Sequence, residues 1–116
     1  MSFCFTIDGQ TVWSPALKVG QLYVAQVREL EQMVGQPPGF RENGADMMKI
    51  KLSKLRDFVL RVGELTQSGN HLLLLQTAPV VLPSVVMLER GGLSMRGQVV
   101  PETWDDAQNL AAFMPA

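Results

Sequence analysis

The chain has 116 residues, of which 47% are hydrophobic and 18% charged, and its formal net charge is −1. This length fits one domain, and the apolar share is large enough to build a core without a metal or a disulfide. We therefore expect a single domain over residues 1–116. A net charge this close to zero argues against non-specific nucleic-acid binding, which needs an excess of Lys and Arg on one face.

The sequence contains one cysteine, Cys4, and one histidine, His71. A single thiol cannot form an internal disulfide, which fits a reducing cytoplasm. Cys4 lies between two Phe residues, where a small buried side chain is expected rather than a nucleophile. One His, one Cys and scattered carboxylates show no metal-ligand spacing and no catalytic triad. We therefore expect no enzyme activity, no metal and no cofactor.

The N-terminal residues have the pattern of a β-hairpin. Apolar side chains alternate with others from Phe3 to Ile7, and the turn sequence Asp8-Gly9 follows. An extended pattern then resumes at residues 11–13. Ser14 is placed to cap a following helix, and Pro15 fits its first position.

The spacing predicts an amphipathic helix over residues 16–34, ended by Gly35. Its predicted apolar face consists of Val19, Leu22, Tyr23, Val27, Leu30, Met33 and Val34. Gln26 falls within this face, where a buried amide would need hydrogen-bond partners.

Residues 36–46 are predicted to form a loop, because two prolines and two glycines argue against regular structure. This loop contains Phe40 and Arg41, residue types that are enriched among binding hot spots. Phe40 can instead fold back onto the core as an internal anchor, which is the interpretation we favour.

A second helix is predicted from Leu52 to Gln67, with one apolar and one charged face. In linear sequence, a basic run precedes and enters it, made of Lys49, Lys51, Lys54, Arg56 and Arg61. On a helix, Asp57 and Glu64 interrupt this run, so we do not expect a phosphate-binding or nucleic-acid-binding patch.

This helix is expected to end at residues 68–70, where Asn70 is placed to cap the next element. The segment from His71 to Leu88 carries no Asp, Glu, Lys or Arg. It is predicted to form an apolar core helix, kinked near Pro79. The alternative is two strands, His71–Thr77 and Val85–Glu89. Membrane insertion is disfavoured by Gln76 and two prolines and by the lack of aromatic residues at the segment's ends.

The last part of the chain is predicted to form a short hairpin over residues 91–100, turning at Arg96-Gly97. A terminal helix over residues 104–113 should follow. Thr103 and Asp106 resemble a capping box for its start.

Several short motifs resemble a family of small, uncharacterised actinobacterial proteins, a domain of unknown function. They are the run from Thr11 to Pro15, Leu22 and Leu30, the run from Val34 to Gly39, Phe58-Val59, and the run from Leu88 to Gly92. Together they span residues 3–92. The chain departs from the family pattern after Gly39 and at Pro79 and Pro83. The resemblance implies a fold and a bacterial setting, and it favours the helical alternative for residues 71–90.

We therefore expect an α+β fold. An N-terminal β-hairpin should pack on a core of three helices, the third apolar and kinked, with a short C-terminal hairpin and helix. The function expected is that of a small cytoplasmic binding module for a protein partner, such as an immunity protein against a toxin. Its candidate partner-binding residues are Trp13, Phe40, Arg41 and Trp104. The alternatives are a self-associating structural protein, a homodimer among them, and a small-ligand carrier or enzyme.

Overall fold

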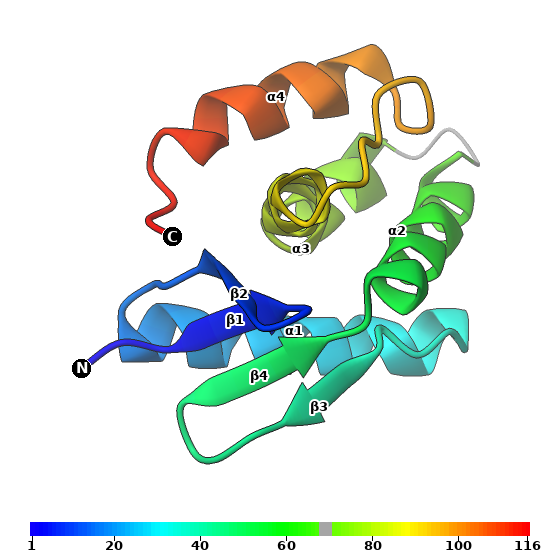
Figure 1. Ribbon diagram of the computed structural model, residues 1–116. Coiled ribbons are helices and arrows are strands. Elements are labelled where there is room, and N and C mark those ends of the chain that lie inside the picture. The colour runs from blue at the N-terminus through cyan, green and yellow to red at the C-terminus, as the bar shows by residue number, and fades with distance from the viewer. Residues whose placement is uncertain (68–70) are drawn as a thin grey trace.

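The computed structural model describes residues 1–67 and 71–116, which form a four-stranded sheet and four helices (Figure 1). The elements are β1 Cys4–Ile7, β2 Gln10–Trp13, α1 Leu17–Val34, β3 Phe40–Glu42, β4 Met47–Ile50, α2 Leu52–Thr66, α3 His71–Arg90 and α4 Pro101–Ala111. The expected α+β class is confirmed. The boundary expected at residues 68–70, with Asn70 as a helix cap, lies outside the described residues.

The sheet combines two hairpins in the order β2-β1-β4-β3. The predicted β1–β2 hairpin is confirmed, and its turn residues Asp8 and Gly9 both have positive φ. β1 pairs in parallel with β4, and β3 pairs antiparallel with β4. Such a parallel pair needs a crossover connection, and the chain between β1 and β4 includes α1, which lies along one face of the sheet (Figure 1).

The loop predicted over residues 36–46 is wrong in part, because β3 lies within it and β4 follows it directly. Gly39 makes the entry to β3 with a φ of +77°, where a side chain would collide with Lys54. β4 is only four residues long, but Met48 and Ile50 are buried while Lys49 is exposed, the alternation of a strand. Pairing of β4 with both neighbours supplies the backbone hydrogen bonds that local propensity does not predict.

α1 confirms the predicted first helix, and its predicted end is also confirmed. Gly35 adopts a left-handed conformation, and its N–H donates to the carbonyl of Glu31 at 2.9 Å. The predicted start is wrong, because Ala16 occupies the N-cap position without a side-chain cap. Ser14 N–H donates to Pro115 O at 2.7 Å and Phe3 N–H to Pro15 O at 2.8 Å, so backbone bonds hold this segment outside the helix.

α2 and α3 confirm the second predicted helix and the helical alternative for residues 71–90, so the two-strand alternative is wrong. α3 contains Pro79 and Pro83, and the kink expected near Pro79 stays a prediction. By length and composition α3 could cross a membrane, but half of the tested segment is buried inside the domain. Such burial is typical of the core helix of a soluble protein.

The C-terminal hairpin predicted over residues 91–100 is wrong, since these residues form turns and no strand. Met95 is fully buried, and its carbonyl accepts bonds from Gln98 N (2.9 Å) and Val99 N (3.2 Å). The predicted terminal helix exists as α4, but it starts earlier, with Pro101 in its first turn. Thr103 therefore lies inside α4 and does not cap it.

A cluster of aromatic side chains joins the sheet to α1. Phe5 is fully buried at its centre and stacks on Trp13 with ring centroids 5.1 Å apart. The Tyr23 ring of α1 meets Phe5 edge-on at 5.4 Å. Phe3 and Phe40 lie 4.9 Å and 6.3 Å from the Phe5 ring. This cluster places Tyr23 and Trp13 at the boundary between the core and the surface described next.

Candidate functional site

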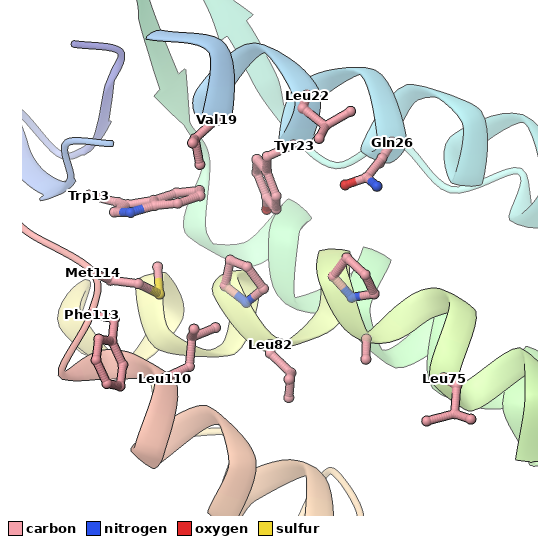
Figure 2. Close-up of a pocket in the computed structure, with 13 residues that line it drawn as sticks. Trp13, Val19, Leu22, Tyr23, Gln26, Leu75, Leu82, Leu110, Phe113 and Met114 are labelled. Carbon is pink, nitrogen blue, oxygen red and sulfur yellow. The ribbon is translucent and has the colours of Figure 1, made fainter. Parts of the chain in front are cut away.

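An apolar groove of about 510 Å³ lies between α1, α3 and the C-terminal segment (Figure 2). α1 forms one wall, α3 forms the opposite wall, and Leu110, Phe113 and Met114 approach from the C-terminal end. Val19, Tyr23 and Gln26 extend from α1 toward α3, whereas Leu75 and Leu82 extend from the side of α3 that faces away from α1 in this view. Trp13 closes the end next to the sheet.

Large apolar side chains of this groove face solvent. Val19 is 51% exposed, Leu22 60%, Leu75 57% and Phe113 82%. Single exposed apolar residues are common on protein surfaces, but a contiguous group around one concavity is typical of a binding site. The groove is therefore the strongest candidate site among the described residues.

A short chain of hydrogen bonds links α1 to α3 beneath the groove. Ser84 Oγ donates to the carbonyl of Val80 at 2.7 Å, so the Tyr23 hydroxyl is the donor in its 2.5 Å bond to Ser84 Oγ. Burial raises the pKa of the Tyr23 phenol, and the bond to Ser84 opposes this only in part. The phenol is therefore a neutral donor that fixes the distance between the groove walls, and it is not a base.

We expect Tyr23→Phe to lower the free energy of unfolding by about 1 kcal/mol, the usual net value of one intramolecular hydrogen bond. Ser84 keeps its bond to Val80, so no buried hydroxyl is left without a partner. Urea denaturation followed by circular dichroism measures the change. A variant as stable as the wild type would show that this bond does not hold the two helices together.

Two prolines of α3 lie beside this apolar groove and interrupt the hydrogen bonds of the helix. Pro79 and Pro83 both line it, one helical turn apart. Because proline has no N–H, the carbonyls of Leu75 and Pro79 lack the donor that a helix normally supplies four residues later.

The four candidate partner-binding residues lie on different parts of the fold. Trp13 lines the groove, but it is buried against Phe5, so little of its surface is available to a partner. Phe40 is half-buried against Tyr23 and Phe5, which confirms that it folds back onto the core. Trp104 is half-buried on α4.

Arg41 is the candidate that is exposed. It lies on β3, in a second, cationic hollow that does not overlap with the groove. Phe40 and Arg41 both line this hollow, Trp13 shares the aromatic cluster with Phe40, and Trp104 lies on α4.

Cys4 and His71 lie on separate elements, at the start of β1 and at the start of α3. Cys4 is half-buried with its Sγ 3.5 Å from Thr11 Oγ1, and His71 is exposed. Within residues 1–67 and 71–116, no three His, Cys, Asp or Glu side chains gather as a metal site would require.

A family model matches the whole chain, residues 1–116. The chain belongs to DUF6086, a family of unknown function. Membership in an uncharacterised family, expected from the sequence motifs, is thereby confirmed. Searches of curated proteins and of solved structures found no match. DUF6086 membership supplies no activity, so the function has to be argued from the groove.

The sequence did not reveal the groove of this DUF6086 chain, because Val19 and Leu22 were assigned to the buried face of α1. The structure turns Gly20, Tyr23 and Val27 toward the core. Gly20 permits this orientation, since a side chain there would collide with Phe3. The glycine at position 20, within an otherwise apolar helix face, was the available signal that another side chain packs closely against the helix backbone.

Proposed function

We propose that this protein is a binding module that holds an apolar helix of a protein partner in the groove between α1 and α3. The observation that carries the proposal is the exposure of Val19, Leu22, Leu75 and Phe113 around one concavity. Burying these side chains under a partner would contribute roughly 25 cal/mol for each Å² of apolar surface removed from water.

The spacing of the walls supports a helix as the occupant. On α1 the groove side chains follow the spacing i, i+3, i+7 at Val19, Leu22 and Gln26. On α3 they follow it at Leu75, Ala78 and Leu82. Two ridges with helical periodicity leave between them the kind of groove into which side chains of a third helix pack.

A protein partner fits better than a second copy of the chain. A two-fold dimer built on this surface would face one groove against another, because the same patch must meet itself. Two concave surfaces leave space between them, whereas a protruding helix fills the groove. A toxin that the bound module neutralises would be one partner of this kind.

Site-specific crosslinking in the native host tests the proposal. A photoreactive phenylalanine analogue replaces Leu22 in one variant and Met33 in a matched control, which is 66% exposed on α1 but outside the groove. We expect Leu22 to crosslink one reproducible protein through a helical segment and Met33 not to do so. Crosslinks only between copies of this chain, or none from Leu22, would contradict the proposal.

Affinity for the crosslinked helix, made as a peptide, gives the quantitative test. We expect Leu22→Asp to weaken binding by at least about tenfold, since truncating an interface anchor typically costs more than 1 kcal/mol and a buried charge adds to this loss. Met33→Asp adds the same charge to α1 outside the groove and should bind like the wild type. Equal losses in both variants would show that the charge, and not the groove, is responsible.

A further inference from the structure

Four cationic side chains surround the second hollow, which has a volume of about 650 Å³ and lies at the end of the sheet next to the start of α2. They are Arg41 on β3, Lys49 on β4, Lys51 and Lys54, and Asp8 is the one acidic residue beside them. All four are exposed. Within the described residues, none of them forms an ion pair.

The strand register makes this cluster unfavourable in the isolated protein. Arg41 lies directly opposite Lys49 across the antiparallel β3–β4 pair. Like charges in directly opposite positions destabilise a strand pair. An anion bound between them would turn this repulsion into attraction, so the arrangement points to a negatively charged ligand.

The basic run seen in the sequence is divided by the fold. Arg56 pairs with Asp57 at 3.0 Å and Arg61 with Glu64 at 2.6 Å, so acidic residues do neutralise these two, as expected. Lys49, Lys51 and Lys54 escape this pairing and join Arg41, which comes from the other hairpin strand. Asp57 and Glu64 thus interrupt the second half of the run, as expected, and leave its first half without an acidic partner.

We propose that this cationic hollow binds an acidic, extended segment of a protein. β3 is an edge strand of the sheet, so one side of its backbone has no strand neighbour among the described residues. Lys51 N–H donates to Gly39 O, and Asn43 N–H donates to Met47 O. Residues 39 and 43, two positions before and two after Arg41, therefore bond toward the β4 side. Since paired and unpaired positions alternate, the peptide groups of Phe40 and Glu42 point toward the free edge.

An extended segment added along this edge would bond to those peptide groups. Side chains of an added strand alternate between the two faces of the sheet. A carboxylate opposite Arg41 would meet the cationic hollow, whereas one opposite Glu42 would be repelled. The segment that fits therefore carries acidic residues at every second position, with uncharged residues between them.

Two features favour a protein segment over a nucleic acid. The hollow has no exposed aromatic side chain on which a base could stack, because the Phe40 ring packs against Phe5 and Tyr23. The chain as a whole has a net charge of −1, so it lacks the excess of positive charge that tracks a phosphate backbone. The free edge of β3, by contrast, offers hydrogen bonds suited to a peptide backbone.

Fluorescence anisotropy with a labelled peptide that alternates Glu and Thr tests the proposal. We expect the wild type to bind this peptide and the double variant Arg41→Glu, Lys49→Glu to bind it at least about fivefold more weakly. The control Lys18→Glu, Arg96→Glu makes the same change in net charge at exposed positions outside the hollow and should bind like the wild type. Melting followed by circular dichroism confirms that each variant is folded.

A charge swap completes the test, because the reversed hollow should gain affinity for a peptide that alternates Lys and Thr. Equal losses in the control pair, or no loss in the Arg41, Lys49 variant, would overturn the proposal. It would also be overturned if single-stranded oligothymidine or anionic phosphatidylglycerol vesicles bound more tightly than the acidic peptide and lost binding in the same variant. None of these results bears on the apolar groove, which shares no residue with the hollow.

Discussion

Phe5→Ala is expected to lower the free energy of unfolding by about 3–5 kcal/mol, the cost typical of removing a fully buried aromatic side chain. Phe5 is 0% exposed and touches the rings of Phe3, Trp13, Tyr23 and Phe40. Its removal leaves a cavity where β1, β2, β3 and α1 meet. Because whole domains of this size are stabilised by only about 5–15 kcal/mol, the loss should be evident in urea denaturation.

The matched control is Phe113→Ala, which removes the same side chain from a largely exposed position at the groove. We expect its stability to stay within about 0.5 kcal/mol of the wild type. If both substitutions cost the same, or if Phe5→Ala costs less than Tyr23→Phe, the aromatic cluster is not the centre of the core.

Long segments with a clear period were predictable from the sequence. α1 and α2 follow from apolar residues spaced three and four apart, and the β1–β2 hairpin follows from alternation around Asp8-Gly9. α3 was harder, because its side chains are apolar all round and carry no helical period. Its C-terminal half, residues 83–88, is buried in the core, which explains the apolar composition there. Its N-terminal half is also apolar, but there Leu72 and Leu75 are exposed.

Elements that depend on partners distant in sequence were not predictable. β3 and β4 have only three and four residues, too few for a period to show. β4 exists because β1, more than thirty residues earlier, supplies its parallel neighbour. The C-terminal turns depend in the same way on the burial of Met95, which no local pattern signals.

The candidate sites were also predictable only where they did not depend on contacts between distant segments. Phe40 and Arg41 were selected for residue type alone, and Arg41 does lie in a hollow of unusual charge. A helical projection places Asp57 and Glu64 among the basic residues of the run, but it cannot show that β3 lies beside Lys49, Lys51 and Lys54. The groove was not predictable because helical periodicity does not show that Gly20 packs against Phe3, with Val19 and Leu22 outside the buried face of α1.

The contact between Gly20 and Phe3 predicts that Gly20→Ala lowers the free energy of unfolding, whereas helix propensity alone predicts that it raises it. In an ordinary helix, Gly→Ala is stabilising by up to about 1 kcal/mol. A Cβ at Gly20 would instead lie closer than 3.0 Å to Phe3, in contact with its Cβ and ring. The Cβ of Phe3 cannot rotate away, so α1 or the N-terminal strand must shift, and overpacking of this kind costs about 1–3 kcal/mol. We therefore expect Gly20→Ala to be destabilising in urea denaturation.

Gly63 offers the matched comparison, because it lies inside α2 and a Cβ there would have nothing within 4 Å. Gly63→Ala should raise the free energy of unfolding by about 0.5–1 kcal/mol while Gly20→Ala lowers it. Two identical substitutions in two helices would then differ in sign, and only the contact with Phe3 distinguishes them. If both were stabilising, Phe3 would not pack on Gly20 as described. The orientation of α1, and with it the outward placement of Val19 and Leu22 that forms the groove, would then need another cause.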